Sequence, residues 1–203
     1  MKGYYFITDA GLSRAGNLSD VQNALAAGVA VVQYREKRAG GREMLAEAGR
    51  LREICRWALF LVNDRVDIAL GVEADGVHLG QDDLPYEMAR RLLGEKKIIG
   101  LTVHNLTEAL AAQKLGADYL GVSPIFATGT KKDGGRPGGV SLIREIKRHV
   151  SIPVIAIGGI NLQNAAAVVQ AGADGVCAIS AVVTSPDVRA EIAKFQALFK
   201  FAG

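Results

Sequence analysis

Two segments of the sequence carry groups that bind phosphate, and each directly follows an apolar run. Residues 127–133 contain two hydroxyls and two adjacent lysines, and they come straight after the strand-like run 119–126. Backbone N–H groups at the end of a buried strand add further donors for an anion. Downstream, Gly158 and Gly159 close another apolar run just before a helix expected near Asn161, and paired glycines let a phosphate approach the backbone. Together the two segments predict a phosphorylated substrate.

A third polar segment has the pattern of a strand end that binds a diphosphate. Gln33, Arg35 and Lys37 alternate with Tyr34 and Glu36, so a strand directs the first three to one side and the other two to the opposite side. A donor amide and two cations on one side suit the oxygens of a diphosphate. Taken alone, the segment fits equally well a solvated strand end whose basic residues form ordinary surface ion pairs.

Carboxylates follow two neighbouring apolar runs. Asp64 comes after the third run, and Asp82 and Asp83 come after the fourth. Adjacent parallel strands would bring them to one face, where two unit charges about 4 Å apart repel by roughly 4 kcal/mol at an effective dielectric constant of about 20. A divalent cation relieves that repulsion, and oxygen-only ligands select a hard ion such as Mg²⁺. The alternative is helix capping, by Asp64 before a helix starting at Arg65 and by Asp82 or Asp83 before a helix after Pro85.

Imidazole and hydroxyl groups are expected at the same face. His78 and His104 are its two candidate ring bases, whereas His149 lies at the end of a predicted helix. A histidine embedded in a strand is more often a satisfied core residue than a catalyst, and no serine or cysteine stands at a spacing that indicates a nucleophilic triad. Thr102, at the end of the fifth run, offers a hydroxyl to a ligand, although β-branched residues are common in strands.

Eight short apolar runs, each followed by an amphipathic helical stretch, must position these groups. Parallel strands buried on both faces are apolar throughout, as several of these runs are. An Ala-Asp pair recurs at the same helix-to-strand corner within 72–77, 115–120 and 171–176. Eight β/α units predict an α/β fold, a single-domain (β/α)₈ TIM barrel over residues 1–203, with a doubly wound sheet as the competing layout. The strands are expected near residues 4–8, 30–34, 58–62, 76–79, 97–102, 118–123, 153–157 and 175–179.

The bulk composition narrows the class of protein. The chain has 203 residues, is 49% hydrophobic and contains no linker-like or low-complexity block, which favours one compact domain. The net charge is +3 and basic residues are interleaved with 21 acidic ones, so no nucleic-acid partner is expected. Cys55 and Cys177 lie far apart in apolar surroundings, which fits reduced thiols. No apolar run approaches a membrane span, so we expect a soluble, cytoplasmic protein without a membrane partner.

Six separated motifs follow one another along the chain. They are Gln33-x-Arg35-x-Lys37, Val62-Asn63-Asp64, Gly76-Val77-His78-Leu79-Gly80-Gln81-x-Asp83, Thr128-x-Thr130-Lys131-Lys132-Asp133, Ala156-Ile157-Gly158-Gly159-Ile160 and Ala178-Ile179-Ser180. In this order they resemble the motifs of the thiamine-phosphate synthase family over nearly the whole chain. One motif alone would be a weak signal, whereas six in the correct order are specific. Thr102 stands where the family commonly has Ser, which retains the hydroxyl, and Ser123-Pro124 stands where Gly-Pro is common.

The resemblance implies a transferase that joins 4-amino-2-methyl-5-hydroxymethylpyrimidine diphosphate to 4-methyl-5-(2-hydroxyethyl)thiazole phosphate, with Mg²⁺, to give thiamine phosphate and diphosphate. It also implies a role for each matching residue. Gln33, Arg35, Lys37 and Asn63 would hold the pyrimidine diphosphate, Asp64 and Asp83 the magnesium, and Thr128, Thr130, Gly159, Ile179 and Ser180 the thiazole phosphate. The residues implied to act on the leaving diphosphate, and also to contact substrate, are Arg35, Lys37, Lys131 and Thr102.

The chemistry of that reaction fits these residues on physical grounds. An electron-donating amino group lets the pyrimidine support positive charge on its exocyclic methylene, so the bond to diphosphate can break before the thiazole nitrogen attacks. Such a step requires stabilisation of the leaving group rather than a strong base, and Arg35, Lys37, Lys131 and Mg²⁺ provide it. Glycines in the segment 134–139 would let the loop close and exclude water.

Two other functions stay open at this point. A thiazole tautomerase or regulator-like paralogue with the same barrel would not need a diphosphate grip, and the joint presence of Arg35, Lys37, Asp64, Asp83 and Lys131 argues against it. A non-catalytic sensor of phosphorylated ligands would bind without turnover. Phosphorylated small molecules are the expected partners in every case.

The apolar C-terminal residues bear on oligomeric state. Phe195, Leu198, Phe199 and Phe201 would pack on the barrel, which we favour, or on a partner subunit, which leaves a homo-oligomer open.

Overall fold

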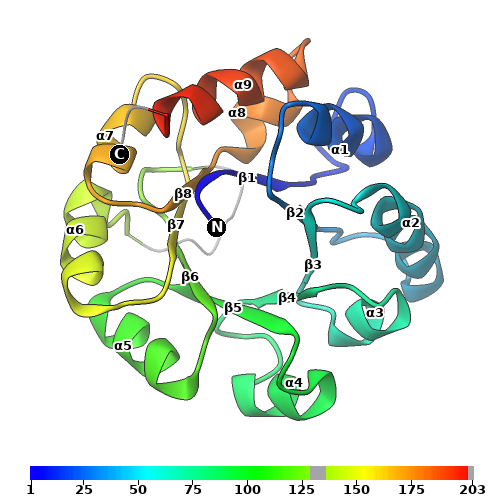
Figure 1. The fold of residues 1–203 in the computed structure, drawn as a ribbon, viewed down its shortest axis with the longest axis horizontal. Coiled ribbons are helices and arrows are strands. Elements are labelled where there is room, and N and C mark those ends of the chain that lie inside the picture. The colour runs from blue at the N-terminus through cyan, green and yellow to red at the C-terminus, as the bar shows by residue number, and fades with distance from the viewer. Residues whose placement is uncertain (129–135, 201–203) are drawn as a thin grey trace.

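A closed barrel of eight parallel strands forms the centre of the protein. The computed structural model describes residues 1–128 and 136–200. The strands hydrogen-bond in sequence order from β1 to β8, and β8 pairs with β1 to close the ring (Figure 1). The (β/α)₈ barrel predicted from the sequence is therefore confirmed, and the doubly wound sheet is excluded. The strands are β1 (Gly3–Ile7), β2 (Val31–Tyr34), β3 (Leu59–Asn63), β4 (Gly76–Leu79), β5 (Ile98–Val103), β6 (Tyr119–Val122), β7 (Val154–Ile157) and β8 (Gly175–Cys177).

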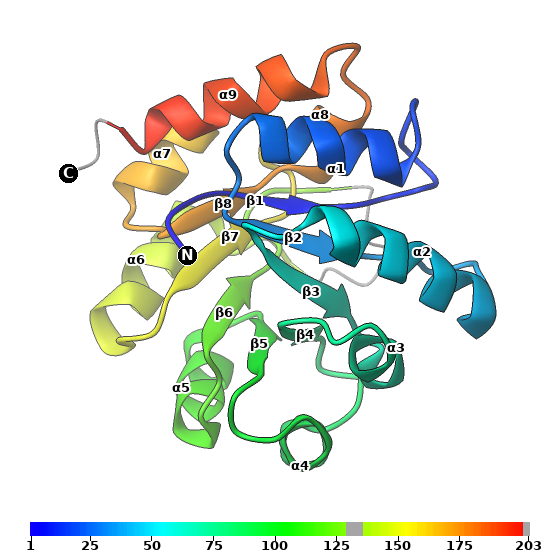
Figure 2. The same cartoon turned by 45° about the vertical axis from the view of Figure 1, so that its right-hand side comes forward.

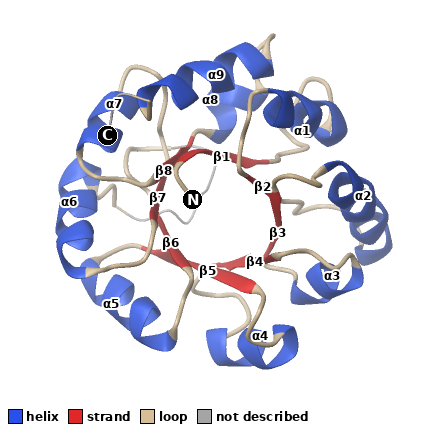
Figure 3. Cartoon of the chain, viewed as in Figure 1, coloured by secondary structure: helices blue, strands red, loops and turns tan. Residues whose placement is uncertain are grey.

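Helices form an outer ring around these strands (Figure 3). Each strand except β8 is followed by one helix before the next strand, and β8 is followed by the short α8 and then by α9. In the tilted view of Figure 2, α1 and α9 lie side by side over β1. The helices are α1 (Asn17–Ala26), α2 (Gly41–Ile54), α3 (Val66–Gly71), α4 (Tyr86–Leu93), α5 (Leu106–Leu115), α6 (Gly139–His149), α7 (Ala165–Gln170), α8 (Ile179–Val183) and α9 (Val188–Leu198).

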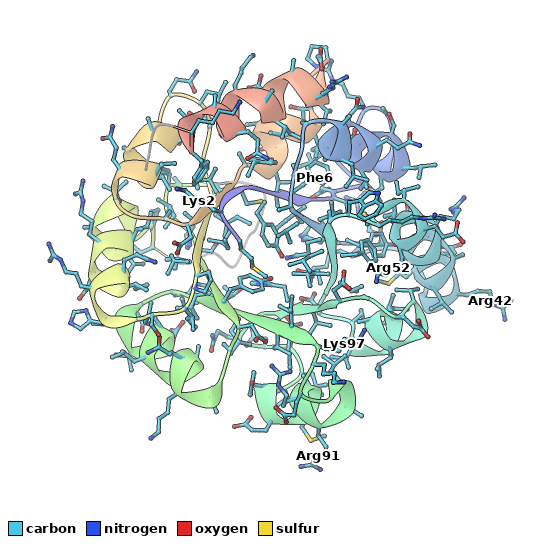
Figure 4. The ribbon with its side chains drawn as sticks, in the orientation of Figure 1. Lys2, Phe6, Arg42, Arg52, Arg91 and Lys97 are labelled. Atoms are coloured by element: carbon cyan, nitrogen blue, oxygen red, sulfur yellow. The ribbon has the colours of Figure 1, made fainter. Side chains whose placement is uncertain are left out.

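Apolar side chains fill two separate spaces. The larger cluster lies between the barrel and the helices and includes Phe6 and Phe195, both fully buried. A smaller cluster lies inside the barrel and includes Tyr5, Leu61 and Tyr119. Figure 4 shows Phe6 among the residues around β1, with side chains filling the centre of the ring. Strands buried on both faces explain why their sequences are apolar runs rather than alternating ones.

The recurring Ala-Asp corner has one structural role at three places. Asp75, Asp118 and Asp174 precede β4, β6 and β8, and each accepts a hydrogen bond from a backbone N–H at the start of the previous strand. Each also pairs with a basic side chain of the helix that leads into that previous strand. Asp75 accepts from the Phe60 N–H at 2.8 Å and pairs with Arg52. Asp118 accepts from the Ile99 N–H at 2.8 Å and pairs with Arg90. Asp174 accepts from the Val154 N–H at 2.7 Å and pairs with Lys147. The corner thus fixes neighbouring strands to the outer helices at the N-terminal end of the barrel.

Helix starts differ from the sequence-based expectations in two respects. The helix expected near Asn161 begins at Ala165, because Asn161 and Asn164 form a turn in which the Asn161 N–H donates to Asn164 Oδ1 at 2.9 Å. The two capping alternatives are wrong. Arg65 and Pro85 occupy the N-cap positions of α3 and α4, and neither helix has a side-chain cap hydrogen bond.

The C-terminal helix belongs to the core of this chain. Phe195 and Phe199 are buried and Leu198 packs against the same cluster, as favoured from the sequence, whereas Phe201 lies outside the described residues. None of the helices in the described ranges 1–128 and 136–200 has the length and apolarity needed to span a membrane.

Gly76 at the start of β4 should be irreplaceable for packing reasons. A Cβ at this position would lie 1.9 Å from the backbone oxygen of Ile98 on β5. We expect Gly76→Ala to lower the free energy of unfolding by about 3 kcal/mol, measured by urea denaturation. Gly49→Ala in α2 is the control, because its Cβ meets nothing within 4 Å, and it should raise stability by about 0.5 kcal/mol. Equal urea midpoints for Gly76→Ala and the wild type would contradict the packing.

Candidate active site

A cavity of about 300 Å³ opens at the C-terminal ends of the strands. The predicted site residues within the described ranges all line it. They are Gln33, Arg35, Lys37, Asn63, Asp64, Asp83, Thr102, Thr128, Gly159, Ile179 and Ser180. Thr130 and Lys131, with the rest of residues 129–135, lie outside the described residues. The barrel therefore gathers residues from seven strand ends, those of β2 to β8, around one cavity, the usual position of ligand sites in this fold.

Side chains alternate in direction along β2 and the residues that follow it, and this places basic groups in the cavity. Gln33, Arg35 and Lys37 line the cavity, whereas Tyr34 points to the outer core and donates to Glu47 Oε2 at 2.8 Å. The guanidinium of Arg35 is held by Asp9 at the end of β1, with 2.8 Å between Nη1 and Oδ2. Sequence reasoning missed Asp9, and its position after the first apolar run was the available signal.

Asp64 leaves β3 in an unusual backbone conformation. Its φ of 61° lies in the left-handed region, which Asp tolerates better than most residues. The Asp64 N–H donates to the backbone oxygen of His78 on β4 at 2.9 Å, which ties the two strand ends together. The carboxylate forms an ion pair with the Lys37 ammonium. The turn therefore presents Asp64 to the cavity instead of to the first turn of α3.

Asp83 reaches the same place from the turn after β4. Its Oδ2 accepts a hydrogen bond from the Gly80 N–H at 2.7 Å, which fixes the carboxylate. Burial raises the pKa of the Asp83 carboxyl, and a hydrogen bond to Asp64 and the charge of Asp64 raise that pKa further. The Gly80 N–H and the Lys37 ammonium act in the opposite direction. The two carboxylates are thus close enough to share a proton or a cation.

This carboxylate pair fits a magnesium ion that binds together with a substrate. Across residues 1–128 and 136–200, no group of three or more His, Cys, Asp or Glu side chains is arranged to hold a metal ion. Asp64 and Asp83 offer only oxygen ligands, which suit a hard cation, and Mg²⁺ is commonly held by one or two carboxylates with phosphate oxygens and water. The donor set is compatible with the ion and incomplete without additional oxygens.

The opposite side of the cavity is built from the ends of β7 and β8. Gly158 and Gly159 have φ values of 98° and 63°, and a Cβ at Gly159 would lie 2.5 Å from the backbone oxygen of Ala127. The Phe126 N–H donates to the Gly158 oxygen at 3.0 Å. The glycines therefore also serve close packing of the segment after β6, a role that sequence reasoning did not assign. Ile179 and Ser180 begin the short α8 beside them.

Histidines occupy supporting positions, as expected from the sequence. His78 Nε2 lies 2.8 Å from Thr102 Oγ1, and the ring is also hydrogen-bonded inside the barrel. His104 Nδ1 contacts the backbone oxygen of Ser123. Gln81, which sequence reasoning placed in a motif without assigning a role, donates from Nε2 to the Thr102 oxygen at 2.5 Å. These contacts fix the hydroxyl-bearing end of β5.

Cys177 lines the cavity from β8 but has no nucleophilic character. Burial raises the pKa of its thiol far above the ordinary value, so the thiolate is not populated at neutral pH. The cavity thus combines cations and paired carboxylates on one side with a glycine turn on the other, and it offers no activated nucleophile among the residues described.

These features define a (β/α)₈-barrel enzyme whose ligand site lies at the C-terminal face of the strands. The sequence model of a family described as thiamine monophosphate synthase matches residues 4–182. The chain therefore belongs to the thiamine monophosphate synthase family, a family of transferases. The family and the enzyme class predicted from the six motifs are confirmed.

Individual relatives agree with this assignment. The chain is 56% identical over 193 residues to a thiamine-phosphate synthase of Methanosarcina barkeri, covering 95% of this chain and 88% of the relative. It is 54% identical over 197 residues to a thiamine-phosphate synthase of Chloroflexus aurantiacus, covering 96% and 91%. A solved thiamine phosphate pyrophosphorylase from Pyrococcus furiosus superposes with a TM-score of 0.91 at 42% identity, covering 98% of this chain and 96% of that one.

The electrostatic contact between the two carboxylates can be measured directly. We expect Asp64→Asn to lower the pKa of the Asp83 carboxyl, because it removes the neighbouring negative charge, and Lys37→Met to raise it, because it removes the positive one. Carboxyl ¹³C NMR titration of the metal-free protein reads both shifts. Opposite shifts support the geometry, and an Asp83 titration unchanged by Asp64→Asn would show that the carboxylates do not interact.

Proposed function

We propose that this chain couples 4-amino-2-methyl-5-hydroxymethylpyrimidine diphosphate to 4-methyl-5-(2-hydroxyethyl)thiazole phosphate and releases diphosphate. One observation carries the proposal beyond family membership. The cations and paired carboxylates follow β2, β3 and β4, whereas the glycine turn and α8 follow β7 and β8, across the ring. Two anionic groups bound at these two sides would leave their organic parts to meet between them. A cavity with two such ends suits two phosphorylated substrates.

The first end would bind the diphosphate. Arg35 is pre-oriented by Asp9, and only 20% of its side chain is exposed, so its charge is screened less than that of a free surface arginine. The Lys37 ammonium, which forms an ion pair with Asp64 in this structure, would also interact with the diphosphate oxygens. Asn63, which lines the cavity beside Asp64, would add an amide donor. Lys131 stays a prediction as the cation on the far side of the leaving group.

Asp64 and Asp83 would hold the magnesium ion at this end. When bound, Mg²⁺ supplies charge stabilisation for the departing diphosphate oxygens. The residues of the chain have their own tasks in that step. The Gly80 N–H holds the Asp83 carboxylate in place. The backbone hydrogen bond from Asp64 to His78 keeps the ends of β3 and β4 at a fixed separation. A site fixed in advance loses little free energy to reorganisation during the reaction.

Breaking of the bond to diphosphate would precede attack by the thiazole nitrogen. The aminopyrimidine supports positive charge on its exocyclic methylene, so leaving-group stabilisation is the main requirement. Arg35 and Lys37 meet it by stabilising charge as it develops on the diphosphate, and the hydroxyl of Thr102 would donate to a substrate oxygen. The inert thiol of Cys177 and the hydrogen-bonded His78 are consistent with a reaction in which the thiazole nitrogen is the nucleophile and the protein supplies neither a nucleophile nor a strong base.

The second end would bind the thiazole phosphate. Gly159 leaves room for a phosphate to approach the backbone, and Ile179 and Ser180 contribute N–H groups at the start of α8, where helix geometry leaves the first donors without intrahelical partners. Phosphate sites in (β/α)₈ barrels are frequently built from the loops after the seventh and eighth strands and a short extra helix. Thr128 would add a hydroxyl, and Thr130 stays a prediction.

The setting of the reaction belongs to the same proposal. Both cysteines, Cys55 and Cys177, are free and buried, which fits a reducing compartment such as the cytoplasm. Small phosphorylated molecules are the partners that the cavity accommodates, and a homo-oligomer stays a prediction.

The coupling reaction separates this function from its alternatives. Mixed with both substrates and Mg²⁺, the chain should release one diphosphate for each thiamine phosphate formed, measured by a coupled phosphate assay and chromatography. Binding of the thiazole phosphate without diphosphate release would favour the tautomerase-like paralogue or the sensor and would refute the proposal.

The same assay tests the metal ligands. We expect Asp83→Ala and Asp83→Asn to reduce kcat about 100-fold or more, because each removes a carboxylate from the cation site. Asp83→Asn is the matched variant, since its side-chain oxygen can still accept from the Gly80 N–H and should preserve the unfolding free energy. Wild-type activity in either variant would rule out Asp83 as a magnesium ligand.

A further inference from the structure

A continuous chain of hydrogen bonds crosses the interior of the barrel beneath the cavity. Gln33 Nε2 lies 2.8 Å from the Tyr5 hydroxyl, which lies 2.8 Å from the Tyr119 hydroxyl. Tyr119 in turn lies 2.8 Å from His78 Nδ1, and His78 Nε2 lies 2.8 Å from Thr102 Oγ1. Gln33 and Thr102, the two ends of this series of hydrogen bonds, line the cavity together with His78, whereas Tyr5 and Tyr119 do not.

The barrel is built to leave room for this chain. A Cβ at Gly100 would lie 2.1 Å from the Tyr119 ring, and a Cβ at Gly121 would lie 2.8 Å from the His78 ring. Tyr5 and Tyr119 are almost completely buried. Burial raises the pKa of both tyrosine hydroxyls well above the ordinary value, so both carry a proton at neutral pH. Both tyrosines are therefore fixed, protonated members of this hydrogen-bond chain.

The direction of the chain follows from its first member. An amide nitrogen only donates, so the Tyr5 oxygen accepts from Gln33 and the Tyr5 proton is directed to Tyr119. The Tyr119 proton then goes to His78 Nδ1, which must be unprotonated, and His78 Nε2–H donates to Thr102. If Tyr119 instead donated to Tyr5, the buried Tyr5 proton would have no acceptor among the described residues, at a cost of about 1–3 kcal/mol.

We propose that Tyr5, Tyr119 and His78 form a one-way hydrogen-bond relay that presents Gln33 to the substrate as an acceptor and Thr102 as a donor. The identity of the substrate in this proposal rests on the proposed function, whereas the direction of the hydrogen bonds does not. With its nitrogen bound to Tyr5, Gln33 has its amide oxygen left for a ligand donor, such as the amino group of the pyrimidine, and not for the diphosphate oxygens to which the sequence predicts that it donates. Thr102 keeps its own proton for a ligand acceptor. Tyr5, Tyr119 and His78 are thus positioning residues for both contacts.

The opposite polarity is a distinct and recognisable state. It requires the Gln33 amide to turn by half a rotation and His78 to carry its proton on Nδ1. Gln33 would then donate to the ligand and Thr102 would accept from it. Because each hydroxyl has one proton to donate, reversing a single hydrogen bond would leave two donors or two acceptors facing each other, so all members must reverse together. The proton position on His78 therefore reports the polarity of both substrate contacts.

The histidine tautomers of the protein without substrate give the primary test. The chain has three histidines, and Nδ1 of His104 and of His149 each faces a backbone carbonyl, so both must carry a proton there. Long-range ¹H–¹⁵N NMR should therefore show one ring, His78, as the Nε2–H tautomer. A His78 ring protonated on Nδ1 would overturn the proposal. Because no substrate is present, this result stands even if the coupling activity is absent.

Tyr119→Phe tests whether the relay positions the substrate. We expect His78 to populate the Nδ1–H tautomer, and kcat/KM for the pyrimidine diphosphate to fall about tenfold, the effect of one lost hydrogen bond. The KM for the thiazole phosphate should change less than about twofold, because the lost hydrogen bond does not lie at the end of the cavity that would bind this substrate.

Tyr34→Phe is the matched control, because its hydroxyl binds Glu47 outside the barrel, and it should leave the His78 tautomer unchanged. Tyr5→Phe replaces Tyr119→Phe if that variant does not fold, with the same expected shift in tautomer. An unchanged tautomer and unchanged kinetics in a folded relay variant would refute the relay.

Discussion

Asp64 and Asp83 line the same side of the barrel mouth, near enough for Asp64 to raise the pKa of the Asp83 carboxyl, and the proposed chemistry of the site depends on that interaction. Neither carboxylate caps a helix. The left-handed backbone conformation of Asp64 directs its own side chain to the cavity, and the Gly80 N–H fixes the carboxylate of Asp83. Their mutual repulsion is opposed by the Lys37 ammonium and, at Asp83, by the Gly80 N–H. A site of this kind favours added positive charge, and a magnesium ion carrying a diphosphate would supply charge and ligands together.

The closed parallel barrel makes this arrangement possible. Parallel pairing brings the C-terminal ends of all eight strands to one face, so residues distant in sequence meet around one cavity. At the other face, the carboxylates of Asp75, Asp118 and Asp174 fix strand starts to outer helices. The chain thus separates its roles, with stability concentrated at the N-terminal ends of the strands and ligand binding at the C-terminal ends.

Much of this could be predicted from local sequence. The alternation of Gln33, Arg35 and Lys37 correctly assigned their side of β2, and the position of Asp64 and Asp83 after neighbouring apolar runs correctly placed them at one face. The missed features are contacts between distant segments. Asp9, after β1, pairs with Arg35, after the neighbouring β2, and Tyr5 lies 114 residues from Tyr119, so neither pairing leaves a periodic signal. The helix expected near Asn161 begins at Ala165, because the side-chain hydrogen bond between Asn161 and Asn164 forms a turn that the local sequence does not reveal.

The most direct test of the central claim is a calorimetric titration of Mg²⁺ into the wild-type protein with and without inorganic diphosphate. If the paired carboxylates form an incomplete site, Mg²⁺ should bind at least about tenfold more tightly with diphosphate present, equivalent to about 1.4 kcal/mol or more. This gain should disappear when Asp64 and Asp83 are both replaced by Asn. Equal Mg²⁺ affinity with and without diphosphate, or an unchanged gain in the double variant, would contradict the account.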